Sequence, residues 1–145
     1  MKTEVLQAAI NYLSYREHAS KELIDKLQHK GFAASDIAEV IVHLQEKNYQ
    51  SDQRYAECII RNRVNKGYGP LYIAQALRQQ GIASSVIEQE IKNQQIDWYL
   101  QAELAYNKRF ADVAIKDNKD RAKRIRFMQN RGFSTEQIFT LLSSD

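Results

Sequence analysis

Proline, glycine and cysteine are all scarce in this sequence, which has one proline, five glycines and one cysteine among 145 residues. A fold rich in β-strands needs many tight turns and usually carries more proline and glycine, so the composition favours helices. With Cys58 alone, no intramolecular disulfide can form, which fits a reducing compartment. No apolar run approaches the ~20 residues that cross a bilayer, and residues 1–4 lead into an amphipathic pattern, not a signal-peptide core. We therefore expect a helical, soluble, cytoplasmic protein.

Patterns that would indicate catalysis or metal binding are also missing. His18, His29 and His43 lack metal-ligand spacing, and no second cysteine is present to complete a zinc site. Cys58 precedes two isoleucines, which favours a small buried filler over a nucleophile. No acid–base or nucleophile pair is in sight, so an enzyme is the least favoured interpretation. We expect no catalytic residue, no metal and no cofactor.

The segment Lys66–Ile82 holds the only proline and three of the five glycines. Gly67 is suited to a left-handed helix stop, and Pro70 to the first turn of the next helix. Gly67–Gly69 superficially resembles a phosphate-binding loop, but no strand precedes it and no Gly-Lys-Ser/Thr follows. The pattern predicts a helix stop, a turn, a helix of about 11 residues and a second stop at Gly81. The apolar stripe expected on this helix consists of Leu71, Ile73, Ala74 and Leu77.

The glycine stops recur with a regular period. Gly31, Gly81 and Gly132 are separated by 50 and 51 residues. Apolar residues match at four further offsets: Leu27, Leu77 and Met128; Phe32, Ile82 and Phe133; Ile37, Ile87 and Ile138; Ile41, Ile91 and Leu142. This periodicity predicts three tandem three-helix repeats, over residues 1–50, 51–96 and 97–145, each too small to bury its apolar face alone. We expect an all-α, elongated and curved array.

Helix starts are predicted at side chains that can accept hydrogen bonds from first-turn N–H groups. The expected caps or starts are Ser20, then Ser35 or Asp36, then Asp52, Asp97, and Asn118 or Asp120. The last of these starts opens a strongly basic helix.

Positive charge is concentrated in the second and third repeats. The chain carries a net charge of +3, with −1, +2 and +2 in the three repeats in order. The basic helix and its end contain Lys119, Arg121, Lys123, Arg124, Arg126 and Arg131. The full set of candidate binding residues is Arg61, Arg63, Lys66, Tyr68, Arg78, Lys108, Arg109, Lys123, Arg124, Arg126 and Arg131. These cations suit phosphates or an acidic protein surface, and a solvated helix face is the plainer alternative.

Tyr68 and Tyr72 lie beside these cations in the sequence. Either ring could stack on a base or fill an interface pocket, and core packing explains them equally well.

Three segments are similar to the signatures of the bacterial RecX regulatory proteins. They are Arg16–Leu23 with Lys26-Leu27 and Lys30–Phe32; Lys66–Pro70 with Ile73, Leu77 and Gly81-Ile82; and Asp97-Trp98 with Arg131–Phe133. The order and spacing match along nearly the whole chain. Two positions depart from the family pattern: Tyr72 stands where many relatives have a basic residue, and Ala19 where serine is common.

The resemblance implies a non-enzymatic modulator of the RecA recombinase, connected with homologous recombination, DNA repair and the SOS response. Such proteins bind along the groove of the RecA filament on single-stranded DNA, suppress strand exchange and the coupled ATP hydrolysis, and also contact DNA directly. We expect no membrane partner and a monomeric protein. The alternative is a helical-repeat nucleic-acid-binding protein that acts without RecA.

Overall fold

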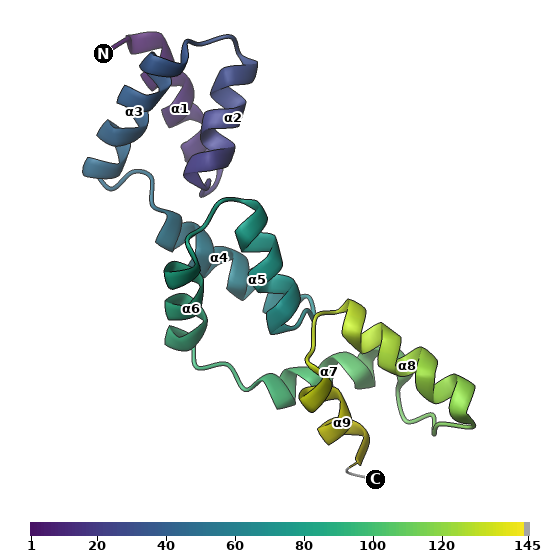
Figure 1. The fold of residues 1–145 in the computed structure, drawn as a ribbon. Helices are drawn as coiled ribbons and strands as arrows, with labels where there is room; N and C mark the ends of the chain where they lie inside the picture. Colours follow the sequence, from purple (N-terminus) through teal and green to yellow (C-terminus); the bar gives the residue numbers. More distant parts are fainter. Residues whose placement is uncertain (144–145) are drawn as a thin grey trace. The chain divides into compact units, whose positions relative to one another are not determined.

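The computed structural model describes residues 1–143, and this part of the chain forms nine α-helices and no strand (Figure 1). The helices are α1 (Thr3–Tyr15), α2 (Ser20–His29), α3 (Ala34–Glu46), α4 (Asp52–Asn65), α5 (Pro70–Gln79), α6 (Ser84–Asn93), α7 (Trp98–Phe110), α8 (Asn118–Asn130) and α9 (Thr135–Ser143). The all-α fold of three successive helix triplets predicted from the sequence is confirmed.

The chain divides into two compact units. The first unit consists of Met1–Cys58 and Leu77–Glu90, and the second consists of Ile59–Ala76 and the chain from Ile91 onward. Helices α4, α5 and α6 each run from one unit into the other.

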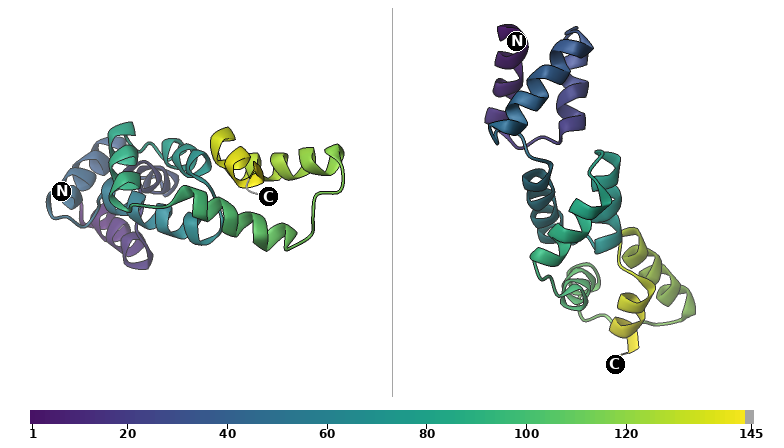
Figure 2. Two further views of the ribbon diagram at one scale, coloured as in Figure 1. Left: turned by 90° about the horizontal axis from the view of Figure 1, so that it is seen from below. Right: turned by 60° about the vertical axis from the view of Figure 1, so that its left-hand side comes forward.

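In the first unit, α1, α2 and α3 pack on one another around a shared apolar core (Figures 1 and 2). The core residues are Val5, Ala9, Leu23, Leu27, Ile37, Val40, Ile41 and Leu44. They recur at three- and four-residue intervals along each helix, so one stripe of every helix faces the other two. In the second unit, α9 packs on both α7 and α8. The core there consists of Ala102, Ala105, Met128, Phe133, Ile138 and Leu142.

The recurring glycines end their helices in one conformation. Gly31, Gly81 and Gly132 have φ values of +90°, +74° and +94°, which glycine adopts without steric cost. The N–H of the apolar residue after each glycine donates to a carbonyl five residues earlier, at Leu27, Leu77 and Met128. This is the Schellman arrangement, in which the residue after the glycine packs back on the helix. The sequence period therefore reflects three copies of one helix ending.

The predicted helix starts are only partly correct. Asp97 caps α7, with its Oδ1 accepting from the Leu100 N–H at 3.1 Å, and α4 begins at Asp52. Ser20, however, lies within α2, whose cap position is Ala19. Helix α3 likewise begins at Ala34, one residue before Ser35. The basic helix begins at Asn118 as expected, but its capping side chain is that of Asp117.

Two apolar predictions are wrong. Leu71 is 58% exposed, whereas Ile73 and Leu77 of the same helix are fully buried. Because each helical residue turns the chain by about 100°, Leu71 lies nearly opposite Ile73 on α5. Cys58, expected to be a core filler, is also exposed.

Candidate partner and nucleic-acid interface

The segment Arg16–Leu23 forms a polar connection to the start of α4. Glu17 Oε2 accepts from Arg54 Nε at 2.9 Å, and Asp52 Oδ1 accepts from the Ser20 N–H at 2.9 Å. Gln50 is buried, and its Nε2 donates to Asp52 Oδ1 at 3.0 Å and to the carbonyl of His18 at 3.1 Å. We call this set the first joint, consisting of residues 16–22 and 50–54. All of it lies in the first unit.

Glu22 closes the turn before α2. Its carboxylate receives both terminal nitrogens of Arg16, at 2.9 and 3.1 Å, and the Ala19 N–H at 2.9 Å. Burial alone raises the pKa of this carboxyl, but the hydrogen bonds from Arg16 and Ala19 outweigh that effect and leave the pKa below its ordinary value. Glu22 therefore satisfies the backbone N–H of the cap residue Ala19, whose own side chain makes no capping hydrogen bond.

His18 is 1% exposed and has a partner on each ring nitrogen. Nδ1 lies 3.0 Å from the carbonyl of Arg16, and Nε2 lies 2.8 Å from Lys26 Nζ. A ring that donates through Nδ1 and accepts through Nε2 satisfies both contacts, and this ring is neutral. Burial, followed by the charges of Arg16 and Lys26, lowers the pKa of His18. Within residues 1–143, no group of three or more His, Cys, Asp or Glu residues is arranged to hold a metal ion.

A second joint connects the turn before α5 to the turn between α8 and α9. The Gly69 N–H donates to the carbonyl of Arg131 at 2.6 Å, and the Leu71 N–H donates to the carbonyl of Gly132 at 2.9 Å. These bonds satisfy N–H groups at the start of α5 that have no partner within the helix. The second joint, consisting of residues 66–72 and 131–132, lies in the second unit.

Glycine is required on both sides of the second joint. A Cβ on Gly69 would lie 2.6 Å from the carbonyl carbon and oxygen of Gly132. A Cβ on Gly132 would lie against the Cβ and the backbone nitrogen of Tyr72. Neither backbone can move aside without breaking the paired hydrogen bonds. The Gly-Tyr-Gly-Pro sequence is therefore more than the helix stop predicted from the sequence. Its backbone is also the docking edge, residues 66–72, on which the third repeat packs.

The same joint organises a column of aromatic and cationic side chains. The guanidinium of Arg131 lies 4.8 Å from the ring centre of Tyr68 and 5.2 Å from that of Phe127. The rings of Tyr68 and Tyr72 are stacked, with centres 4.1 Å apart and planes 16° apart. Arg131 Nη1 also donates to the carbonyl of Lys66 at 3.4 Å. Arg131 and Tyr68 are half-buried, so each keeps some exposed surface while its contacts within the protein fix its position.

Arg124 is buried, unlike its neighbours on the basic helix. It is 3% exposed, and its Nη1 donates to the hydroxyl of Tyr106 and to the carbonyl of Val113, both at 2.7 Å. Asp120 pairs with it at 3.2 Å, and its guanidinium lies 4.8 Å from the ring centre of Phe110. The hydrogen bond with Tyr106 is the main cause of the raised pKa of Arg124. Arg124 thus anchors the loop before α8 and is not available to a partner.

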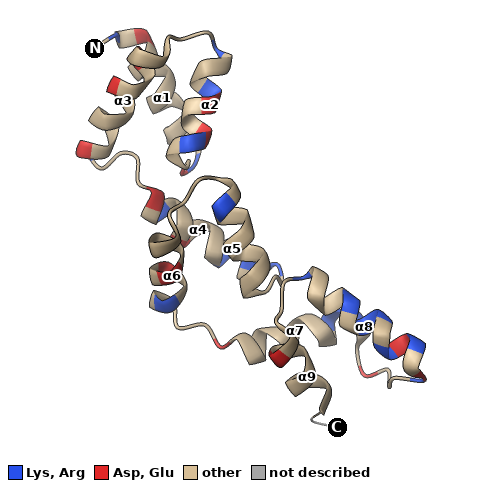
Figure 3. Cartoon of the chain, in the orientation of Figure 1, with Lys and Arg blue, Asp and Glu red and all other residues tan. Residues whose placement is uncertain are grey.

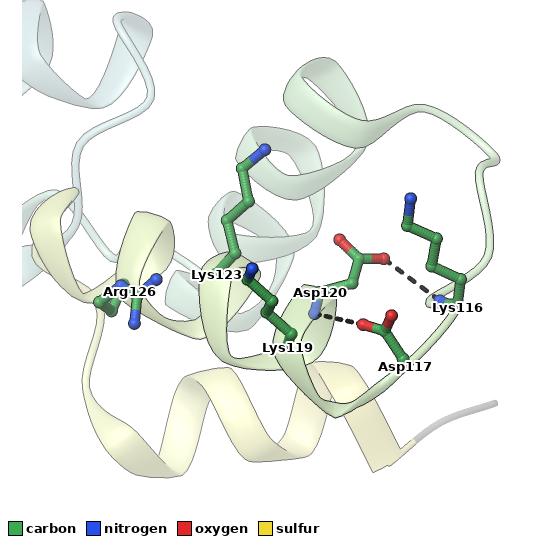
Figure 4. A pocket seen from close by; sticks show the side chains of 6 residues that line it. All are labelled: Lys116, Asp117, Lys119, Asp120, Lys123 and Arg126. Carbon is green, nitrogen blue, oxygen red and sulfur yellow. Dashed lines mark hydrogen bonds between the residues drawn. The ribbon is translucent and has the colours of Figure 1, made fainter.

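Of the other cations of α8, which are coloured blue in Figure 3, Lys119, Lys123 and Arg126 are exposed, whereas Arg121 is half-buried with its guanidinium over the ring of Phe139. Lys116, Lys119, Lys123 and Arg126 line an open hollow of about 470 Å³ together with Asp117 and Asp120 (Figure 4). Three of these cations, at positions 119, 123 and 126, follow a three- and four-residue spacing that places them on one face of the helix. Lys116 was missed in the sequence; it lies in the loop before α8, three residues ahead of Lys119.

The two carboxylates of the hollow are engaged within the protein. Asp117 Oδ1 accepts from the Asp120 N–H at 2.7 Å. Asp120 accepts from the Lys116 N–H at 3.2 Å and also pairs with Arg124. The hydrogen bond from the Lys116 N–H is the main cause of the lowered pKa of Asp120. No hydrogen bond or ion pair within residues 1–143 involves the side chains of Lys119, Lys123 or Arg126, so these charges face solvent.

The other candidate residues are distributed more widely. Arg61, Lys66 and Lys108 are exposed and belong to the second unit, whereas Arg78 is exposed and belongs to the first. Arg63 is half-buried, with Nη1 bound to Asn62 Oδ1 at 2.7 Å. Arg109 is exposed, and its guanidinium lies over the ring of Phe110. The second unit therefore contains every candidate except Arg78.

Comparisons with known proteins agree along the whole array. Models of the first, second and third three-helix domains of RecX match residues 6–52, 51–91 and 97–142. The Regulatory protein RecX of Vibrio parahaemolyticus is 44% identical over 137 residues, covering 94% of this chain and 88% of that protein. That of Halorhodospira halophila is 35% identical over 134 residues, covering 92% and 83%.

Solved structures show the same fold. The crystal structure of RecX from Lactobacillus salivarius matches with a TM-score of 0.81 and 25% identity, covering 97% of this chain and 93% of that one. No helix in the described chain is both long and apolar enough to span a bilayer. Three matched domains in order, supported by relatives at 35–44% identity, show that the chain belongs to the RecX family of regulatory proteins.

Proposed function

We propose that this protein binds the RecA–single-stranded DNA filament and restrains its recombinase and ATP-hydrolysing activities. The proposal extends the regulatory role of the family to a specific target. The observation that carries it is the stripe of unpaired cations on α8 at Lys119, Lys123 and Arg126, next to the family-typical fold. Partner-free cations on one helix face suit phosphates or acidic side chains, both of which a nucleoprotein filament offers.

The proposed role needs no chemistry from this chain. In this proposal the protein is a cytoplasmic monomer, and its repeats at residues 1–50, 51–96 and 97–145 present their surfaces to the filament. Direct contact with single-stranded DNA is a secondary part of the interaction. Of the candidate residues, Arg61, Lys66, Arg78, Lys108, Arg109, Lys123 and Arg126 are exposed and stay in the proposed surface, together with the half-buried Arg63, Tyr68 and Arg131. Arg124 is left out because its guanidinium is consumed internally.

The test is the DNA-dependent ATP hydrolysis of RecA, measured with increasing amounts of this protein. We expect inhibition below one molecule of this protein per RecA. The triple substitution Lys119→Ala, Lys123→Ala and Arg126→Ala should weaken binding to the filament. The matched control removes three exposed lysines elsewhere, with Lys30→Ala, Lys47→Ala and Lys92→Ala, and should retain wild-type inhibition. Uninhibited hydrolysis at equimolar wild-type protein would overturn the proposal.

A second candidate function is binding of nucleic acid without RecA, which the same exposed cations favour. Titration of bare single-stranded DNA and of preformed filament at several salt concentrations separates the two. Tighter binding to the filament supports the primary proposal, whereas equal affinities support the second. For bare DNA, loss of three phosphate contacts should reduce the slope of log affinity against log salt by about 2.

A further inference from the structure

The column at the second joint ends on an exposed aromatic ring. Tyr72 is 37% exposed and stacks with one face on Tyr68. The 4.1 Å between the two rings leaves no room for a guanidinium, so Arg131 lies on the other side of Tyr68. Along residues 1–143, no ring or cationic group lies on the second face of Tyr72. The column thus runs from Phe127 through Arg131 and Tyr68 to Tyr72, whose second face meets no ring or cation of the described chain.

This ring is held in place before any partner arrives. The position that a Cβ on Gly132 would occupy lies against the Cβ and backbone of Tyr72, so the turn after α8 abuts the base of this side chain. The Leu71 N–H, one residue earlier, is tied to the carbonyl of Gly132. A flat ligand that stacks on such a ring has little side-chain freedom to remove, which favours binding.

The electrostatic surroundings suit a negatively charged strand. Residues 59–76 include Arg61, Arg63 and Lys66 and contain no aspartate or glutamate. Lys66 is exposed, and its carbonyl is held by Arg131. An aromatic residue within a cationic, carboxylate-free segment of the sequence is typical of proteins that bind single strands, with aromatic faces for bases and cations for phosphates.

We infer that the outer face of Tyr72 is a stacking site for a nucleobase of single-stranded DNA. This deepens the proposed function by assigning its direct DNA contact to a residue. Stacking on a ring tolerates any base, because every base presents a flat π-face, and its strength does not depend on counterion release. The site therefore adds affinity without selecting a sequence, as coating of a filament along any DNA requires.

The test uses bare DNA and no RecA, so its outcome is independent of the proposed function. Wild-type protein is titrated with a fluorescein-labelled oligonucleotide and with an abasic oligonucleotide of equal length, which keeps the phosphates but lacks the bases. We expect about fivefold tighter binding of the base-containing strand, the lower end of the range for one base stacked on one aromatic ring. Tyr72→Leu, which keeps Tyr68 covered but offers no π-face, should abolish this preference. Tyr72→Phe should retain it.

Tyr99→Leu is the matched control, because Tyr99 is a similarly exposed tyrosine (45%) of the same unit with no place in the column. It should leave the preference unchanged. In parallel, oligonucleotides that contain 5-iodouracil should photocrosslink to Tyr72. The inference is overturned if wild-type protein binds both strands equally or neither, if Tyr72→Leu keeps the preference, or if crosslinks map elsewhere. In a separate titration with the RecA filament, a Tyr72→Leu protein that loses filament affinity but binds bare DNA as the wild type does would also overturn the inference and assign the ring to a protein partner.

Discussion

The first and second joints connect successive repeats by different chemistry. In the first joint, side chains make the connection, through Glu17 with Arg54 and Ser20 with Asp52. In the second joint, backbone groups of Gly69 and Leu71 bond directly to the next repeat's backbone. Side-chain contacts tolerate gradual change, because one pair can be lost while others remain. Backbone contacts depend on close approach, so a single added methyl group disrupts them. The comparison predicts that the second joint is more sensitive to small substitutions.

The largest effect is expected from Gly132→Ala. The new Cβ would collide with the backbone of Tyr72, and the φ of +94° is strained for alanine, so we expect a loss of at least ~3 kcal/mol of stability. Gly31→Ala is the control, because Gly31 has the same conformation (φ +90°) with no atom within 4 Å of the added methyl. It should cost about 1–2 kcal/mol, the strain alone. Denaturant unfolding, with amide exchange of α8 and α9, measures both. Equal losses would refute the docking role of Gly132.

A smaller effect is expected from Asp52→Ala in the first joint. The substitution leaves the Ser20 N–H without its acceptor and removes one of the two acceptors of the buried Gln50 amide, which should cost about 1–3 kcal/mol. Asp25→Ala, at an exposed position of α2, should change stability by less than about 0.5 kcal/mol. Thermal unfolding of the two variants gives the comparison. A neutral Asp52→Ala would show that the side chains of the first joint are redundant.

The smallest effect on stability is expected when the pH is lowered, and it should be confined to the first joint, where His18 lies. The pKa of His18 is lower in the folded protein than in the unfolded chain, so below about pH 6.5 the unfolded chain binds a proton that the folded protein does not. Stability should therefore fall as the pH drops from 7 to 5, by at most about 1.4 kcal/mol per pH unit for this one group. Residues 97–145 contain no histidine, so α7–α9 should lack this dependence.

Amide exchange at several pH values measures the acid effect in each triplet separately. His18→Gln, which cannot take up the proton, should remove the dependence. A first triplet as stable at pH 5 as at pH 7 would contradict the neutral state assigned to His18.

The sequence predicted the repeated helix endings correctly, because each depends on local geometry. A positive φ at Gly31, Gly81 or Gly132 and a hydrogen bond five residues back need only the residues around the glycine. Asp97 was likewise identified as a cap from its local position. Burial of single apolar residues was predicted less well, because the apolar stripe predicted for α5 included Leu71, which lies on the exposed side of that helix.

Contacts between distant segments were not predictable from the sequence. Nothing near Gly69 indicates that its missing side chain makes room for Gly132. Arg124 looked like any other cation of α8, although its spacing of four from Asp120 was a signal for an internal pair. The carbonyl of Val113, which is another acceptor of Arg124, lies in an irregular loop that has no recognisable sequence pattern. The set of binding cations predicted from the sequence therefore includes one residue, Arg124, whose charge is used inside the protein.

The second joint also has a consequence for synthesis of the chain. The first joint pairs Ser20 with Asp52 and Glu17 with Arg54, so all its partners exist once residue 54 has been added to the chain. The Gly69 N–H must wait for the carbonyl of Arg131, whose side chain contacts a residue 65 positions earlier. Long sequence separations slow the search for native contacts. During elongation residues 66–72 therefore lack their partner until the chain has been synthesised past Gly132.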